Sequence, residues 1–354
     1  MPLLLSTIAI ILIGLLAIYS ASNGSNNYVK KQAFFFITGL GLAFIISFIT
    51  SETISKFAGK IYGFTIFLLI LVLVFGSRIK GAQRWIDFGF IQLQPSEIAK
   101  IALIMCLAVY LVARINDIKS FKIFLGSFIY ILFPLFLIFK QPDLGTSLAI
   151  VAIWISMNFI MGTSGKNILI FFLFVTLTAG VAWTVPNILK PYQKERIITF
   201  IDPNKDPLGS GYHVSQSKIA IGSGGIYGKG FLKGTQKKLE FIPEQHTDFA
   251  FTVIGEEFGM VGCLVVIVLY GVLILRLVQI MLVSEDLIGR AMIAGITGLF
   301  IFHIFVNIGM TVGIMPVTGL PLPFISYGGT ALWTSLIAIG IAEGVAMRRH
   351  KITF

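Results

Sequence analysis

Long runs of apolar residues, separated by short polar connections, follow one another along the whole sequence. A helix needs about 20 apolar residues to cross the hydrocarbon core of a bilayer, because each residue adds about 1.5 Å. The pattern therefore predicts an all-α polytopic membrane protein of about ten spans, with both termini on the same side. The predicted spans are residues 3–19, 33–50, 61–76, 96–113, 121–139, 144–162, 167–189, 249–275, 288–313 and 328–347.

Composition supports this class and excludes a soluble one. Hydrophobic residues make up 56% of the 354 positions and charged residues only 12%, whereas a soluble domain carries about 25% charged residues. A soluble chain of this length has no means of hiding so much apolar surface from water. Cys106 and Cys263 both lie within apolar runs, so they indicate neither a disulfide framework nor a metal site.

The distribution of Lys and Arg predicts that both termini are cytoplasmic. With that orientation, eleven basic residues fall on the inner side: Lys56, Lys60, Arg114, Lys119, Lys122, Lys166, Arg276, Arg290, Arg348, Arg349 and Lys351. Six fall in the short outer loops: Lys30, Lys31, Arg78, Lys80, Arg84 and Lys140. Short loops on the cytoplasmic side of a membrane carry an excess of Lys and Arg, so the bias favours this orientation.

One connection, residues 190–248, is much longer than the others and lies on the predicted outer side. The rest of the chain offers no boundary, so residues 1–354 form a single integral membrane domain with one long extracytoplasmic loop. The loop carries nine Lys and Arg residues against six acids. This charge suits a phosphate-bearing lipid substrate, and it suits a loop facing lipid headgroups almost as well. Residues 214–221 are expected to form a short amphipathic helix on the membrane surface.

Residues capable of chemistry gather at the predicted outer ends of the spans. Asp248 directly precedes a span, where it is either a helix N-cap or a general base at the membrane surface. Glu97 and Lys100 share one helical face, either as a cap with a snorkelling lysine or as a functional ion pair. Glu256 and Glu257 lie about 12 Å deeper than Asp248. They are expected to bind Lys or Arg from another span, or to set local protonation, rather than to form a paired-carboxylate site with Asp248.

Five motifs in this order resemble the SEDS family (shape, elongation, division and sporulation) over essentially the whole chain. The motifs are Gln83–Ile86, Gln94–Glu97, Gln141–Thr146, Pro243–Phe249 and Pro323–Gly329. Within the family, residues 219–236 are more similar to the rod-shape branch, RodA, than to the division branch, FtsW. The resemblance implies an inverting peptidoglycan glycosyltransferase that uses lipid II at the outer face of the bacterial cytoplasmic membrane during cell elongation. It also implies a class B penicillin-binding protein as transpeptidase partner, with other elongation-complex membrane proteins and no nucleic acid.

The resemblance places the family's essential carboxylate on Asp248 and its other important residues on Trp85, Glu97 and Lys100. In the resulting hypothesis, Asp248 deprotonates a sugar hydroxyl of lipid II, which attacks the growing strand and expels undecaprenyl pyrophosphate. Candidate cations for the leaving group are Arg84, Lys100 and Arg196, with a divalent ion (Mg²⁺ or Mn²⁺) left open as cofactor. The remaining substrate-binding candidates, all in the outer motifs, are Asp143, Ser326 and His246.

Three alternatives remain open from the sequence. A flippase for the lipid-linked precursor also fits about ten spans with intramembrane charges, although such transporters place their ionisable residues near the membrane midplane. A division-type FtsW paralogue differs mainly in the process it serves. A scaffold for the cell-wall machinery leaves the clustering of the outer motifs unexplained.

Overall fold

The computed structural model describes residues 2–79, 82–89, 91–185, 191–202, 205–206, 209–235 and 245–348. Among these residues, nine helices are long and apolar enough to cross a membrane, and the apolar helix α6 is slightly shorter. The prediction of an all-α membrane protein with about ten spans is therefore confirmed. The ten helices are α1 (Pro2–Ala21), α2 (Asn26–Ser47), α3 (Ser51–Phe75), α4 (Pro95–Val112), α5 (Phe121–Lys140), α6 (Leu144–Ile160), α7 (Gly165–Thr184), α11 (Ala250–Val283), α12 (Leu287–Val312) and α13 (Gly329–Met347).

Several helices extend beyond the apolar runs that predict them. Helix α2 begins at Asn26 and α3 at Ser51, earlier than the expected positions 33 and 61. The first turns of both helices are polar, so hydropathy alone does not include them. Thr50 fixes the start of α3, because its hydroxyl accepts a hydrogen bond from the backbone N–H of Thr53 at 3.2 Å, as an N-cap does.

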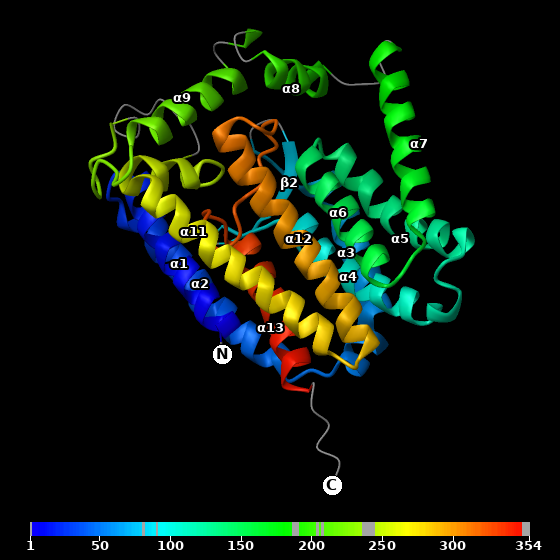
Figure 1. The fold of residues 1–354 in the computed structure, drawn as a ribbon. Coiled ribbons are helices and arrows are strands. Elements are labelled where there is room, and N and C mark those ends of the chain that lie inside the picture. Colours follow the sequence, from blue (N-terminus) through cyan, green and yellow to red (C-terminus); the bar gives the residue numbers. More distant parts are fainter. Residues whose placement is uncertain are drawn as a thin grey trace.

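Helices α4 and α12 lie in the interior of the bundle. Within their apolar windows, 83% of α4 and 67% of α12 is buried, compared with 6% of α7. Helix α4 packs against α3, α5, α6, α12 and α13, whereas α7 stands at the edge of the bundle (Figure 1). Residues 186–189, predicted to continue the α7 span, lie outside the described residues. The interior position of α4 explains how a charged pair on that helix is kept away from lipid.

Helices α2 and α13 approach each other closely through two glycines. A Cβ at Gly340 would lie 2.5 Å from the carbonyl oxygen of Ala43, and a Cβ at Gly344 would lie 2.7 Å from that of Ser47. Glycines spaced four apart allow two helix backbones to approach in this way within a membrane. This contact fixes the position of α13, whose first residues border the candidate site.

At one end of the bundle, a small antiparallel sheet precedes α4. Its strands are β1 (Ser77–Ile79), β2 (Ala82–Asp87) and β3 (Gln92–Leu93), in the order β1-β2-β3. Ser77 pairs with Trp85, and Ile86 pairs with Leu93. The pattern of apolar and polar residues does not predict these strands. The sheet sets the direction of Arg84 and Trp85 over the end of α4.

The long connection forms two helices across the same end of the bundle (Figure 1). These are α8 (Pro191–Ile201) and α9 (Ser210–Ser223), the second of which confirms the helix expected at 214–221. Parts of the connection, including residues 236–244, lie outside the described residues. One short 3-10 helix, η1 (Ile115–Asp117), joins α4 to α5 at the other end. The polar residues of the candidate site therefore lie beneath α8 and α9.

Candidate functional site

An irregular segment, residues 313–328, connects α12 to α13 and forms a wall shared by several candidate residues. It begins at Gly313, which ends α12 in the left-handed conformation with φ of 79°, as glycine readily does at a helix C-terminus. Asn307 on α12 donates its side-chain amide to the carbonyl oxygens of Asp248 (3.0 Å) and Leu320 (2.7 Å). One side chain therefore holds the segment beside the turn that carries Asp248.

Asp248 lies half-buried in the turn 245–249, directly before α11. The N-cap of α11 is Phe249, so the interpretation of Asp248 as the capping residue is wrong. The Oδ2 atom of Asp248 lies beside Gly319, 3.5 Å from the position that a Cβ there would take. Because Gly319 has no side chain, the backbone of the 313–328 segment comes close to the carboxylate of Asp248.

Glu97 and Lys100 form a buried ion pair in the first turns of α4. The Nζ atom of Lys100 lies 2.7 Å from Oε1 of Glu97, and the two residues are 2% and 4% exposed respectively. The other carboxylate oxygen, Oε2, accepts a hydrogen bond from the hydroxyl of Thr334 at 3.3 Å. Both oxygens of Glu97 are therefore occupied by side chains. The alternative in which Glu97 caps the helix while Lys100 snorkels outward is wrong.

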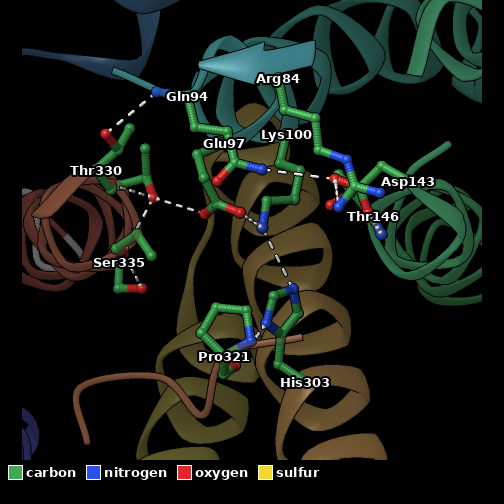
Figure 2. Close-up of polar contacts among 12 residues, drawn as sticks. Arg84, Gln94, Glu97, Lys100, Asp143, Thr146, His303, Pro321, Thr330 and Ser335 are labelled. Atoms are coloured by element: carbon green, nitrogen blue, oxygen red, sulfur yellow. Dashed lines mark hydrogen bonds and ion pairs between the residues drawn. The ribbon is translucent and has the colours of Figure 1, made fainter. Parts of the chain in front are cut away.

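His303 extends this pair to the 313–328 segment. Its Nε2 atom lies 3.3 Å from Nζ of Lys100, and its Nδ1 atom lies 3.2 Å from the carbonyl oxygen of Pro321. Figure 2 shows His303 and Pro321 on one side of the ion pair and Arg84 with Asp143 on the other. Two spans and the irregular segment are thus joined through one buried lysine.

A cavity adjoins this network, and we call it the α4–α12 cavity. It is a narrow cavity, and its polar lining includes Glu97, Lys100, His303, Ser326 and Thr334. Ser326 also supports the segment locally, because its Oγ accepts a hydrogen bond from the backbone N–H of Leu322 at 2.8 Å. The cavity therefore presents a compensated charge pair rather than a free cation.

Arg84 and Asp143 fasten the sheet to the turn between α5 and α6. Arg84 donates from Nε to the carbonyl oxygen of Gln141 at 2.9 Å and from its terminal nitrogen to that of Pro142. It also lies 3.7 Å from Asp143, whose carboxylate caps α6 by accepting from the backbone N–H of Thr146 at 3.2 Å. These contacts make both residues architectural supports at the edge of the site.

His246 belongs to an aromatic cluster close to Asp248. Its ring centroid lies 4.7 Å from that of Tyr28 and 5.6 Å from that of Tyr327. Its carbonyl oxygen accepts a hydrogen bond from the backbone N–H of Tyr327 at 2.8 Å. Burial, together with the nearby Tyr28, raises the pKa of Tyr327. The Tyr327 hydroxyl therefore stays protonated at neutral pH and is available as a donor.

The structure divides the predicted site residues into three groups along the 313–328 segment. Glu97, Lys100 and Ser326 share the α4–α12 cavity. Arg84 and Asp143 contact each other beside it, with the half-buried Trp85 on the same strand as Arg84. Further along the segment, His246 and Asp248 lie on one turn, while Arg196 on α8 reaches the carbonyl oxygen of Thr318 at 3.5 Å.

Three residues that hold the site together carry no clear sequence signal for that role. The sequence explains His303 and Asn307 equally well as ordinary interhelical hydrogen-bonding residues, four positions apart in one span. The partner of His303 is Lys100, which is separated from it by 203 positions. Thr334 resembles any other small polar residue of a transmembrane helix. The only indication in the sequence is that His303 is an ionisable residue within a membrane span, which is usually functional.

Glu256 and Glu257 anchor the end of the long connection to α11, near a break in that helix at Gly259 (φ 64°). Glu256 accepts hydrogen bonds from Lys229 at 2.8 Å and from the backbone N–H of Thr235 at 2.7 Å. Glu257 accepts one from Ser20 at 2.5 Å. Glu256 does bind a lysine, but the expectation that it comes from another span is wrong, because Lys229 lies in the long connection.

Removing the charge at Glu256 should loosen residues 224–235. Glu256→Gln loses charge-assisted hydrogen bonds worth about 1.5–3 kcal/mol, so we expect amide hydrogen exchange in these residues to be roughly 10–100 times faster. Hydrogen-exchange mass spectrometry on the purified protein measures this. Lys233→Gln, an exposed change in the same stretch, should leave exchange unaltered. Equal exchange in Glu256→Gln and wild type would show that the carboxylate does not hold the stretch.

Comparison with known proteins adds a family and close relatives. The family model for FtsW, RodA and SpoVE, described as cell cycle protein, matches residues 1–351. Peptidoglycan glycosyltransferase MrdB of Escherichia coli K12 is 38% identical over 353 residues, covering 99% of this chain and 94% of that protein. Peptidoglycan glycosyltransferase RodA of Treponema pallidum is 34% identical over 421 residues, covering 98% and 97%.

A solved structure shares both the fold and part of the sequence. It comes from work on the structural coordination of polymerization and crosslinking by a peptidoglycan synthase complex. Its TM-score is 0.83 at 32% identity, and the match covers 99% of this chain and 98% of that one. The likeness extends over all the elements that carry the candidate site.

Proposed function

The chain belongs to the FtsW/RodA/SpoVE family of cell cycle proteins and is a peptidoglycan glycosyltransferase, and we propose that it extends glycan strands from lipid II during cell elongation. The growing strand is transferred from its undecaprenyl-pyrophosphate carrier to lipid II at the outer face of the cytoplasmic membrane. One observation carries the proposal furthest. Asp248, a half-buried carboxylate, lies beside Gly319 of the 313–328 segment, and the same segment borders a polar cavity and a basic pocket.

In the proposed step, Asp248 accepts the proton of a sugar hydroxyl on lipid II. The hydroxyl oxygen forms a bond to the anomeric carbon of the growing strand, and the bond from that carbon to the pyrophosphate oxygen breaks with inversion. The electron pair leaves with undecaprenyl pyrophosphate, and the proton remains on Asp248 until solvent removes it. Support comes from Asn307, which fixes the backbone of Asp248 at 3.0 Å and so limits movement of the base.

The leaving pyrophosphate needs positive charge, and the three candidate cations differ in their position. Lys100 is only 2% exposed and is paired with Glu97 at 2.7 Å. Arg84 is directed at the carbonyl oxygens of Gln141 and Pro142. Arg196 reaches the carbonyl oxygen of Thr318 and lines a pocket between α8, α9 and the 313–328 segment, beside the turn that carries Asp248. We therefore assign the pyrophosphate to Arg196, while Lys100 and Glu97 shape the α4–α12 cavity and Arg84 supports the turn.

A divalent cation has no preformed protein site within the part of the chain that the structure describes, because no three His, Cys, Asp or Glu side chains gather there. Among the described residues, the donors around Asp248 do not fit a resident metal, and no step of the mechanism above uses one. We propose that a requirement for Mg²⁺ or Mn²⁺, where polymerisation shows one, reflects the substrate pyrophosphate. Titration of the substrate-free protein with Mn²⁺ should then give no saturable binding, whereas tight binding would contradict this.

The test of the proposed function is polymerisation of lipid II by the purified protein in detergent, alone and with a class B penicillin-binding protein. The relative in a peptidoglycan synthase complex supports such a partner. Detergent solution has no two sides, so glycan product cannot arise from flipping. Product would support the enzyme, and lipid II movement across vesicles without any product would support the flippase instead.

The start of α1 and the end of α13 lie at the same end of the bundle, opposite α8 and α9 (Figure 1). Taken with the Lys and Arg bias, this arrangement supports a cytoplasmic position for both. We expect single cysteines at Asp117 and Glu285, in connections at the end with the termini, to resist a membrane-impermeant thiol reagent in intact cells. A cysteine at Lys205, in the α8–α9 connection, should react. Labelling of the first two alone would reverse the orientation.

A further inference from the structure

A second pocket lies between α8, α9 and the start of the 313–328 segment, and we call it the α8–α9 pocket. It contains about 560 Å³ of empty space. Arg196 and Lys218 both line it, one from each helix. Lys218 is exposed, and its ammonium group lies directly against the α carbon of Gly313, where a Cβ would collide with it. Two cations, Arg196 and Lys218, thus line one pocket beside α8 and α9.

The rest of the lining is largely apolar. Phe200 and Val214 contribute apolar side chains from α8 and α9, and Met315, Pro316 and Val317 contribute from the segment. Phe200 is 41% exposed and Val214 is 8% exposed. The pocket therefore combines two positive charges with an apolar wall. This is the combination that suits a phosphate group attached to a hydrocarbon chain.

Hydrogen bonds fix one wall of the pocket without any ligand. Ser217 on α9 is fully buried. Its hydroxyl lies 2.6 Å from that of Thr252 on α11 and donates to the carbonyl oxygen of Thr311 on α12 at 2.8 Å. Lys218, the next residue, is therefore carried on a turn of α9 that is fastened to two membrane spans. A preformed pocket loses little entropy when a ligand binds.

The pocket and Asp248 use the same stretch of backbone. Arg196 reaches the carbonyl oxygen of Thr318 at 3.5 Å. The next residue, Gly319, borders the carboxylate of Asp248. A phosphate held by Arg196 is therefore placed beside the residue proposed to initiate the transfer. This adjacency connects the pocket to the reaction rather than to a remote lipid contact.

We propose that the α8–α9 pocket binds the diphosphate of an isoprenoid-linked sugar, with Lys218 as a second phosphate-binding residue beside Arg196. The inference rests on the proposed function and deepens it. The apolar wall then receives the isoprene units nearest the diphosphate. The same chemistry serves the donor before transfer and the released polyprenyl diphosphate afterwards.

A structural role for Lys218 makes a different prediction. Its ammonium lies at the C-terminus of α12, where a cation interacts favourably with the helix dipole by about 0.3–1 kcal/mol. In that case Lys218→Gln would lower the thermal stability of the protein and leave ligand affinity unchanged. If Lys218 binds phosphate instead, Lys218→Gln changes the thermal stability little and lowers the affinity for the ligand. The two roles are therefore separable by measuring both quantities on the same variant.

The experiment is calorimetric titration of the purified full-length protein with farnesyl diphosphate, a short isoprenoid diphosphate. We expect Lys218→Gln and Arg196→Gln each to weaken binding about tenfold, which corresponds to one charge-assisted contact. Lys194→Gln is the matched control, because Lys194 lies on α8 but does not line the pocket. Farnesol and inorganic pyrophosphate should both bind more weakly than farnesyl diphosphate, because each lacks one half of the ligand.

Two results would overturn the proposal: unchanged affinity in Lys218→Gln, or equally tight binding of short-chain phosphatidylglycerol. The second would make the pocket a general anionic-lipid site. Neither result depends on turnover, so both are distinguishable from failure of the proposed function, which the lipid II polymerisation assay measures separately. If wild type polymerises lipid II and Lys218→Gln does so with an unaltered KM, the function stands and the pocket assignment falls.

Discussion

Asp248→Asn is expected to lower the rate of lipid II polymerisation by about 10²–10⁴-fold, the contribution that a general base typically makes. The substitution keeps the size and most hydrogen-bonding capacity of the side chain but cannot accept the proton of the attacking hydroxyl. The backbone contact from Asn307 to Asp248 involves the carbonyl oxygen, so it survives the change. Stability should therefore be nearly unaltered while turnover is lost.

The measurement is the initial rate of glycan product formation by purified variants, with thermal unfolding recorded in the same detergent. Asp87→Asn provides a matched control. Asp87 is an exposed carboxylate at the same end of the bundle, and its oxygens contact Gly89 and Gln92 within the small sheet. It should retain the wild-type rate. A wild-type rate in Asp248→Asn would remove Asp248 from the chemistry altogether.

The second large effect concerns the buried pair of Glu97 and Lys100. Removing one partner leaves an uncompensated charge in the protein interior, at a cost of about 3–5 kcal/mol. We therefore expect Glu97→Gln and Lys100→Met each to lower the unfolding midpoint strongly. The double variant leaves no unpaired charge, so it should regain much of the lost stability. Its polymerisation activity should stay low, because His303 and the α4–α12 cavity lose their partner in Lys100.

Thermal unfolding and lipid II polymerisation are measured for the wild type, the two single variants and the double variant. Together they separate the contribution of the pair to stability from its contribution to activity. The exposed pair Glu52–Lys56, at 3.0 Å with side chains 78% and 67% exposed, supplies the control. Glu52→Gln should cost at most about 0.5 kcal/mol, as exposed helical pairs do. Recovery of full activity together with stability in the double variant would mean that the pair is purely structural.

The sequence alone was sufficient for the class of protein, the positions of the membrane spans and the end of the bundle that bears the motifs. These features depend on local quantities: the length of an apolar run, the position of a charge relative to it, and the spacing of residues on one helix. The helix at 214–221 followed from the same kind of local pattern, and α9 contains it. The sheet at 77–93 did not, because its strands are short and their pairing depends on neighbouring strands.

The tertiary structure decided the contacts within the site. The contact of Lys100 with His303 joins residues 203 positions apart, and that of Glu97 with Thr334 joins residues 237 positions apart. Such contacts follow from how α4, α12 and α13 pack, which no single span encodes. The same packing brings Asp248 beside Gly319 and places Arg196 at Thr318. The sequence by itself determined which segments span the membrane and which residues carry charge at one end of the bundle. Only the fold decided which of those charges compensate one another and which line a pocket, because electrostatic pairing depends on distances of a few ångströms between helices.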